Sequence, residues 1–174
     1  MNTPSAKMLV MVDKQCACIR IIGRANFTSS VDFKTLLTEL RQRGCCRFIL
    51  ELSECVLMDS TFLGVLAGFG LKFGAAGKDK PGRPIELLDP TPRITELLET
   101  LGVLHLFKLT RGPLDLAACA QPVKSAPAKP TKADISRACL EAHQTLIDIN
   151  PANAALFQDV AQFLAEGLKK PETP

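Results

Sequence analysis

Short apolar runs open the chain, and an amphipathic segment follows them. Lys7 to Gly23 contains two runs rich in apolar and β-branched residues, divided at Asp13-Lys14-Gln15, which predicts a hairpin or two adjoining strands. Apolar residues then recur near helical spacing at Val31, Leu36, Leu37 and Leu40. Because hydroxyl residues precede this stripe and arginines and a glycine end it, we predict a helix from Ser29 to about Arg43.

The middle of the chain alternates further apolar runs with helical patterns. Arg47 to Leu52 is apolar enough to be a buried strand, and VLMDSTFLGVLAGF leads from it into a helix expected from about Ser60 to Phe73. GAAGKDKPGRP has the composition of a turn-forming loop. We predict a strand at Ile85 to Asp89, a helix in TPRITELLETLG and a last strand at His105 to Thr110. This alternation predicts an α/β fold, a mixed β-sheet packed with α-helices.

The C-terminal third differs in composition. Residues 120–133 are rich in proline, alanine and lysine, which is typical of a linker that cannot bury enough surface to order itself. Two apolar stripes at helical spacing follow, at Ile135, Ala138, Cys139, Ala142, Leu146 and Ile149 and at Leu156, Val160, Phe163, Leu164 and Leu168. We therefore predict an α/β domain over 7–119, a linker over 120–133 and a C-terminal helical hairpin over 134–170.

This predicted hairpin needs a surface on which to bury its apolar stripes. Two short helices hide only part of their stripes on each other, and exposed apolar area costs about 25 cal/mol per Å². A linker of roughly a dozen residues gives a high effective concentration, so docking on the α/β domain of the same chain is favoured. The alternative is burial against a second copy, which would form a homodimer through the C-terminal helices.

Length and charge exclude several classes of function. With 174 residues, 47% of them hydrophobic, the chain can bury one core and a small appendage. Its 21 basic and 18 acidic residues are scattered and it has no tryptophan or tyrosine, so nucleic acid is not an expected partner. The longest uncharged apolar stretch, Phe62 to Leu71, is about half of what a membrane-spanning helix needs. The start also lacks the apolar core of a secretory signal, and we expect a soluble, cytoplasmic protein without membrane insertion.

Candidate catalytic chemistry is sparse. The seven cysteines form no CxxC pair, and neither His105 nor His143 has a cysteine or an acid near it at ligand spacing, so we expect no metal site. The sequence also lacks the G-x-S-x-G and GxxxxGK[ST] motifs. We therefore expect neither enzyme activity nor a cofactor.

One motif carries a family resemblance. MDSTFLGVLAGF resembles the D-S-[ST]-G-L-G-V signature of the STAS domain family, whose type members are bacterial anti-sigma factor antagonists. RFILELSECVLMDS is similar to the family's central strand running into that motif, and IELLDPTPRITELLETLGVLHLFKL to its later strand, helix and strand entry. The resemblance covers roughly Lys7 to Leu116. It implies a STAS-like domain that works by docking proteins in bacterial signal transduction and transcription regulation.

The resemblance also implies a switch. In antagonist members, the serine after the aspartate is phosphorylated by a partner kinase that is also an anti-sigma factor, and a phosphatase reverses this. By position, Ser60 would be the phospho-acceptor, with Thr61 as the alternative. A helix start tolerates the phosphate charge of about −1.5 to −2, so we expect binding and not folding to be switched. The predicted partner-binding residues are Asn26, Asp59, Ser60, Thr61 and Phe62.

Two positions depart from the family pattern. Phe62 stands where glycine usually follows the hydroxyl pair, and Asn26 stands where antagonists tend to have an acid after the first hairpin. Both differences fit a relative that docks without being phosphorylated, such as a STAS adaptor of a transporter or sensory complex. A sensor of a small ligand or nucleotide, using the edge near Asp59, is a third alternative.

Overall fold

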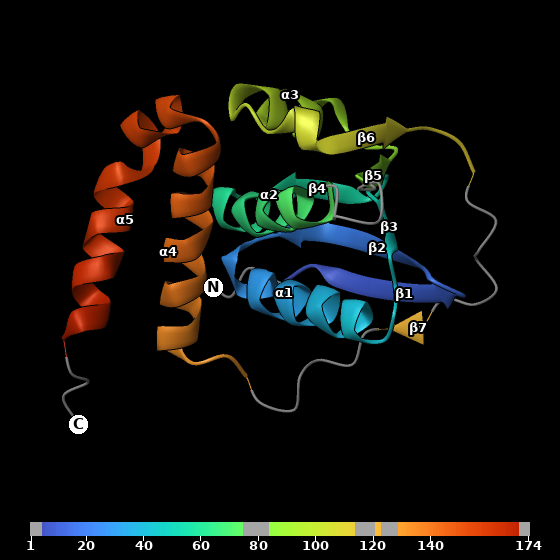
Figure 1. The fold of residues 1–174 in the computed structure, drawn as a ribbon, viewed down its shortest axis with the longest axis horizontal. Helices are drawn as coiled ribbons and strands as arrows, with labels where there is room; N and C mark the ends of the chain where they lie inside the picture. Colours follow the sequence, from blue (N-terminus) through green and yellow to red (C-terminus); the bar gives the residue numbers. More distant parts are fainter. Residues whose placement is uncertain (1–4, 75–83, 114–120, 123–128, 171–174) are drawn as a thin grey trace, which may run out of the picture.

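A mixed β-sheet forms the centre of the computed structural model, which describes residues 5–74, 84–113, 121–122 and 129–170 (Figure 1). The strands are β1 (Lys7–Asp13), β2 (Cys16–Ala25), β3 (Arg47–Glu51), β4 (Cys55–Met58), β5 (Ile85–Leu88), β6 (Phe107–Thr110) and β7 (Gln121–Pro122). Their order is β6-β5-β3-β2-β1-β7, and β4 pairs with the second half of β2. The β1 strand is antiparallel to β2 and β7, whereas the other pairs are parallel.

Helices pack against this sheet and beside it. They are α1 (Phe27–Gln42), α2 (Ser60–Gly74), α3 (Pro92–Thr100), α4 (Lys132–Ile149) and α5 (Ala154–Lys169), with 3₁₀ turns at Leu104–Leu106 and Pro151–Asn153. Figure 1 shows α1 and α2 side by side over one face of the sheet, α4 running across them, and α5 on the outer side of α4. Among the described residues, no helix is both long and apolar enough to cross a membrane. The predicted α/β fold with a mixed sheet is confirmed.

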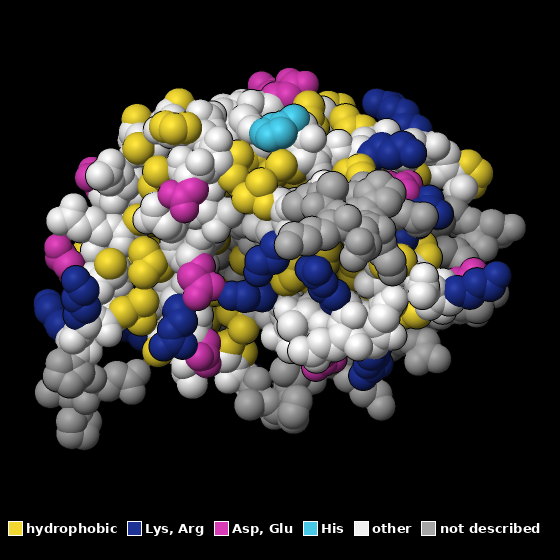
Figure 2. All heavy atoms as spheres, in the orientation of Figure 1, with side chains coloured by type: hydrophobic (Ala, Val, Ile, Leu, Met, Phe, Trp, Pro, Cys, Tyr) yellow, Lys and Arg dark blue, Asp and Glu magenta, His cyan; other side chains and the backbone are white. Residues whose placement is uncertain are grey.

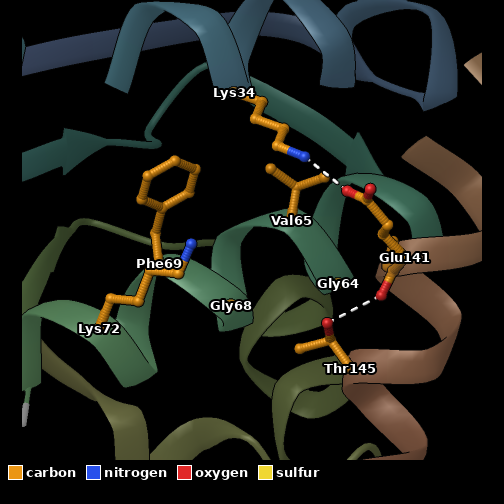
Figure 3. A pocket seen from close by; sticks show the side chains of 9 residues that line it. Lys34, Gly64, Val65, Gly68, Phe69, Lys72, Glu141 and Thr145 are labelled. Atoms are coloured by element: carbon orange, nitrogen blue, oxygen red, sulfur yellow. Dashed lines mark hydrogen bonds and ion pairs between the residues drawn. The ribbon is translucent and has the colours of Figure 1, made fainter. Parts of the chain in front are cut away.

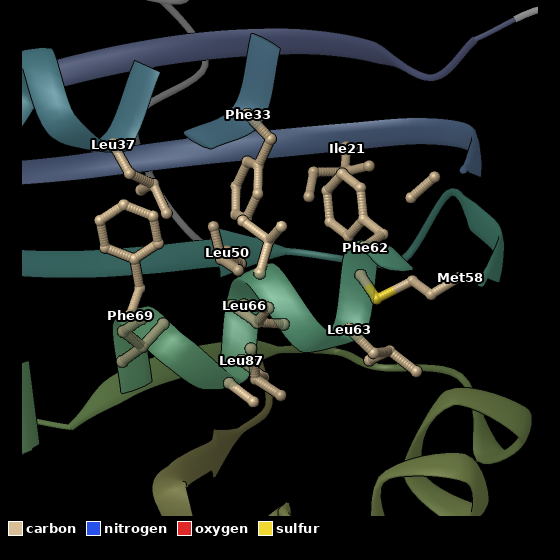
Figure 4. Close-up of a cluster of buried hydrophobic side chains, with 14 of the residues drawn as sticks. Ile21, Phe33, Leu37, Leu50, Met58, Phe62, Leu63, Leu66, Phe69 and Leu87 are labelled. Atoms are coloured by element: carbon tan, nitrogen blue, oxygen red, sulfur yellow. The ribbon is translucent and has the colours of Figure 1, made fainter. Parts of the chain in front are cut away.

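The main core lies between the sheet and the helices α1 and α2 (Figure 4). The rings of Phe33 on α1 and Phe62 on α2 stack there with their centroids 4.5 Å apart. Side chains alternate along a strand, so Phe48 and Leu50 of β3 point into this core. Ile49 points the other way and joins a smaller cluster on the opposite face of the sheet. The α1–α2 face of the sheet therefore carries most of the buried apolar surface.

Local chemistry moves several element boundaries. The first helix begins at Phe27, two residues before the predicted start, because Asn26 and not a hydroxyl residue is its N-cap. The strand β4 is missing from the sequence prediction, since its four residues show little alternation. The predicted strand at His105 begins instead at Phe107, after a 3₁₀ turn. The predicted turn-forming loop lies almost entirely outside the described residues.

Two parts of the segment 120–133 belong to elements of the described structure. Gln121 and Pro122 pair with the edge strand β1, opposite Val10 and Leu9. The helix α4 begins within the segment at Lys132, with Thr131 as its N-cap. The division of the chain into a domain, a linker and an extension stays a prediction.

The two C-terminal helices, together the C-terminal hairpin, differ in burial. In the structure, α4 packs on α2 of the same chain, and α5 packs on α4. Of the stripe predicted for α5, Leu156, Val160 and Phe163 are exposed, Phe163 by 74%. Ala161 is buried instead, and Phe157, which lies outside the predicted stripe, packs on His143 of α4. Figure 2 shows hydrophobic side chains scattered among charged ones over this end of the molecule.

Candidate functional site

Asp59 lies between β4 and α2 and connects two helix starts. Its Oδ1 atom accepts a hydrogen bond from the backbone N–H of Phe62 at 2.9 Å, so it caps α2. Its Oδ2 atom accepts from the N–H of Phe27, the first residue of α1, at 2.6 Å. The N–H of Asp59 donates to the Ala25 carbonyl and extends the pairing of β2 with β4. Both carboxylate oxygens are therefore held by backbone amides at the positive ends of α1 and α2.

Ser60 and Thr61 form the first turn of α2 and face α4. Ser60 Oγ lies 2.9 Å from His143 Nε2, and the Thr61 hydroxyl donates to Cys139 Sγ at 3.5 Å. Cys139 and His143 are four residues apart, so they lie on the same face of α4. Ser60 is half-buried, whereas Thr61 is only 4% exposed. The two hydroxyls of the motif are thus covered by the C-terminal hairpin.

Small residues allow α4 to approach α2 closely. A Cβ atom at Gly64, one turn after Ser60, would lie 2.4 Å from the Ala142 carbonyl oxygen and 2.6 Å from the Ala142 Cβ atom. One turn further, a Cβ atom at Gly68 would meet only Thr145 Cγ2, at an ordinary 3.7 Å. Gly64 therefore serves the packing of α2 on α4, and the tighter approach of these two positions lies one turn after Ser60.

An ion pair joins α4 to α1 at the edge of this contact. Lys34 Nζ lies 2.5 Å from Glu141 Oε2, and both side chains are exposed to solvent. Figure 3 shows this pair closing one side of a pocket of about 120 Å³ between α1, α2 and α4. The Thr145 hydroxyl on the same face of α4 donates to the Glu141 carbonyl. The contact is thus polar at its rim and closely packed at Gly64.

The turn between α4 and α5 is fixed to the end of α3. The Asn153 side chain is buried, and its Nδ2 atom donates to the carbonyls of Leu101 and Leu146, both at 2.9 Å. Gly102 follows α3 with a φ of +70°, which favours glycine. A Cβ atom there would also lie 2.6 Å from Asn150 Nδ2. The C-terminal hairpin therefore contacts α1, α2 and the end of α3.

His143 is a buried, neutral imidazole. It is 6% exposed, and its ring lies 4.9 Å from that of Phe157 on α5. Burial lowers its pKa, and a contact with the Cys139 carbonyl and the charge of Asp59 oppose this shift in part. Its Nδ1 atom is buried without a well-formed hydrogen bond. Burial also raises the pKa of Cys139, so the thiol beside Thr61 stays protonated at neutral pH.

The pair of Ser60 and His143 has the spacing of a nucleophile and its base. Catalysis of that kind also needs a group that orients the imidazole, and no carboxylate bonds to His143 Nδ1 among the described side chains. Within the same part of the chain, no group of three or more His, Cys, Asp and Glu residues is placed to hold a metal ion. The geometry is that of a close helix–helix contact.

The structure gives two of the predicted partner-binding residues internal roles. Asn26 Oδ1 accepts from the N–H of Ser29, and Ser29 Oγ accepts from the N–H of Asn26, which forms a capping box. Phe62 is 0% exposed and belongs to the main core, and its contact with a partner stays a prediction. As the third residue of α2 it points toward Phe33 and the sheet, away from α4. Asn26 and Asp59 meet at the start of α1, whereas Ser60 and Thr61 meet α4.

His143 and Cys139 were not predicted as site residues. Both belong to α4 and contact residues about 80 positions earlier in the chain, which local patterns do not reveal. One signal was present, since His143 stands in the apolar stripe of α4, between Ala142 and Leu146. A histidine on a face that must be buried needs a polar partner there.

Comparisons with known proteins support the fold. No protein-family model matches the chain, and no curated protein matches it. The anti-sigma factor antagonist SpoIIAA in its unphosphorylated form is similar in structure, with a TM-score of 0.52 and 18% sequence identity, over 65% of this chain and 93% of that one. The Bacillus cell fate determinant SpoIIAA in its phosphorylated form gives a TM-score of 0.50 and 18% identity, over 65% and 96%. The chain therefore has a STAS-like fold.

Proposed function

We propose that this protein is a regulatory, protein-binding domain of the anti-sigma factor antagonist type, and that Ser60 is its phospho-acceptor. The observation that carries the proposal is the place of Ser60 in a STAS-like fold, as the first residue of α2 directly after the capping Asp59. SpoIIAA, which has a similar fold, is described in an unphosphorylated and a phosphorylated form. The implied setting is the cytoplasm of a bacterium.

The physical chemistry of the α2 start suits this role. The free N–H groups and the dipole of a helix start stabilise an anion, so phosphate on Ser60 is compatible with α2. Ser60 is a better acceptor than Thr61, because Thr61 is almost fully buried and its hydroxyl is bonded to Cys139. In the reaction, Ser60 Oγ bonds to the γ-phosphorus of ATP, ADP leaves, and the hydroxyl proton passes to the kinase or to solvent.

The expected partners follow from the same proposal. They are an anti-sigma factor with serine kinase activity, which binds the unmodified domain, and a phosphatase that restores it. Phosphate on Ser60 places about −1.5 to −2 charge next to the carboxylate of Asp59. A partner surface complementary to a neutral hydroxyl then meets like charges, and binding is lost.

Phosphate mapping tests this proposal. The full chain is incubated with ATP and an extract of its native cells, and the modified residue is identified by mass spectrometry. We expect phosphate on Ser60, lost in Ser60→Ala and retained in Thr61→Ala. Modification at Thr61 alone would show that the acceptor is assigned to the wrong residue. Absence of phosphate on both would refute the switch.

The C-terminal hairpin packs over Ser60, and this favours one alternative, a STAS adaptor that is never phosphorylated. In such a protein α4 stays docked, and a transporter or sensory subunit binds elsewhere, for example on the exposed stripe of α5. Partner binding separates the two candidates, because Ser60→Glu abolishes binding by the switch and leaves binding by the adaptor unchanged. A sensor of a small ligand at Asp59 has less support, since backbone amides hold both of its carboxylate oxygens.

A further inference from the structure

We propose that the C-terminal hairpin is a built-in cover of the Ser60 face, and that docking of α4 on α2 and a charged group on Ser60 exclude each other. The inference rests on the proposed function for the source of that charge, the phosphate. It adds a regulatory element outside the α/β domain: the kinase reaches Ser60 only when α4 has left α2, and phosphate on Ser60 keeps α4 away.

Space is the first argument. Ser60 Oγ and His143 Nε2 are already at hydrogen-bond distance, 2.9 Å, so a phosphorus atom and three oxygens on Ser60 need the volume of the imidazole. The two helices are in close contact one turn away, because a Cβ atom at Gly64 would lie only 2.4 Å from the Ala142 carbonyl oxygen. Thr61 also contacts Cys139 on the same side. The docked α4 therefore occupies the space toward which the Ser60 hydroxyl points.

Charge is the second argument. An anion on Ser60 would face the neutral, buried ring of His143 and lie next to the carboxylate of Asp59. A buried anion is costly unless a cation or several donors compensate it. Lys34, a described cation that pairs with α4, is held by Glu141 at the rim, and Lys72, which lines the same pocket, lies over the ring of Phe69. When α4 is released, the same anion is exposed to water at a helix start, where it is tolerated.

The third argument is that the cover is separable from the core. Next to Ser60 the contact consists of polar or small side chains, namely Ser60, Thr61, Gly64, Cys139, Ala142 and His143, and further along α4 Leu146 is buried in the main core. The large core side chains of α2 point the other way, toward α1 and the sheet. Contacts of this polar kind resemble those between domains that move relative to each other. Release of α4 would expose Leu146 and leave the strands, α1 and the inner face of α2 packed on one another.

Linkage makes the effect reciprocal. If docking of α4 opposes a charge on Ser60, then a charge on Ser60 opposes docking by the same free energy. The reciprocity allows a test that needs no kinase, because a carboxylate introduced at position 60 supplies the charge. Failure of this test is distinct from failure of the proposed function, which depends on phosphate being found on Ser60.

The test is hydrogen exchange of the full chain, as wild type, Ser60→Glu, Ser60→Ala and Ser53→Glu, at a pH where His143 is neutral. Ser53→Glu adds the same charge at an exposed position of the same domain. We expect Ser60→Glu to speed exchange over Lys132–Ile149 by about five-fold or more, the lower end of typical coupling between two sites. The strands and α1 stay protected, and Ser53→Glu has no such effect. Ser60→Ala, which removes one hydrogen bond without adding charge, stays close to the wild type.

Two results would overturn the inference. One is unchanged exchange in α4 of Ser60→Glu, which would mean that docking tolerates the charge. The other is an equal loss of protection in α4 and in the strands, both in Ser60→Glu and in the shorter-chain variant Ser60→Asp. In that case α4 would be part of the core and not a cover.

Discussion

The two faces of α2 are built in different ways. Its inner face presents large apolar side chains, and Phe62 stacks there on Phe33 in the main core. Its outer face presents hydroxyls and glycines to α4, with hydrogen bonds between Ser60 and His143 and between Thr61 and Cys139, and a close approach at Gly64. The inner face therefore stabilises the fold through apolar burial, whereas the outer face is matched to one particular neighbour by shape and hydrogen bonding.

This difference shows how one helix can serve both stability and regulation. Apolar burial at the inner face is lost only when the domain unfolds. Release of the outer face costs less, because its hydroxyls remain hydrogen-bonded to solvent and its glycines expose no side chain, and the main apolar loss is exposure of Leu146 of α4. Substitutions on the two faces should therefore have different consequences, global unfolding from the inner face and release of the C-terminal hairpin from the outer face.

The largest effect is expected from Phe62→Ala. Loss of a fully buried ring next to Phe33 should reduce the free energy of unfolding by about 3–5 kcal/mol. Urea denaturation measures it, with Phe163→Ala as the control. Phe163 is 74% exposed, so its truncation should change stability by less than about 0.5 kcal/mol. A comparable loss in Phe163→Ala would show that α5 is buried in solution, for instance in a homodimer through the C-terminal helices.

The next effect concerns Gly64→Ala, with Gly68→Ala as its match one turn later. At Gly64 the new methyl group collides with the backbone of Ala142, which should weaken docking of α4 by about 1–3 kcal/mol. At Gly68 the methyl group has room, and better helix propensity should stabilise α2 by about 0.5–1 kcal/mol. Exchange over Lys132–Ile149 should rise in the first variant alone. Equal exchange in both would contradict the close approach of the helices.

A smaller effect is expected from pH through His143. Burial holds its pKa below the ordinary value of 6.5, so docked α4 binds fewer protons than released α4. Docking should therefore be strongest above pH 6.5 and weaken as the pH falls from there through the lowered pKa. Exchange in α4, corrected for intrinsic rates, is compared at about pH 7.5 and about pH 5.5. His143→Gln should lose this dependence, and its persistence there would assign it to another group.

The smallest effect is expected from Glu141→Gln. The ion pair with Lys34 lies in solvent, so its loss should weaken docking by about 0.2–1 kcal/mol, and less at high salt. The readout is again the exchange rate over α4, at low and high ionic strength. A loss as large as that in Gly64→Ala would mean that charge, and not shape, holds the outer face of α2.

Local patterns in the sequence were sufficient for most of the fold. Four predicted elements appear in the structure close to their predicted bounds, because each depends on neighbouring residues. They are the two strands in Lys7 to Gly23, the strand in Arg47 to Leu52 and the capped helix after Asp59. Ser60 was placed correctly at the start of α2 for the same reason. Secondary-structure propensity and hydrophobic periodicity act over a few residues, so they can be recognised from the sequence alone.

The contacts of the site could not be predicted from local patterns in the sequence. Asp59 bonds to Phe27, 32 residues away, and Ser60 to His143, 83 residues away. Such pairs depend on how α4 is rotated and placed on α2, which periodicity does not determine. The same limit applies to α5. Part of its predicted apolar stripe is exposed, whereas Ala161, which is not in that stripe, is buried.

A reversible disulfide between α2 and α4 would show whether α4 must leave α2 before Ser60 is phosphorylated. Thr61 Oγ1 lies 3.5 Å from Cys139 Sγ, so Thr61→Cys places two thiols close enough for a disulfide after a small adjustment. The oxidised and reduced forms of this variant are each incubated with ATP and native cell extract, with the wild type treated alike, and phosphate on Ser60 is quantified. We expect phosphorylation of the reduced form and almost none of the oxidised form, in which α4 cannot leave α2. Equal phosphorylation of both forms would contradict it.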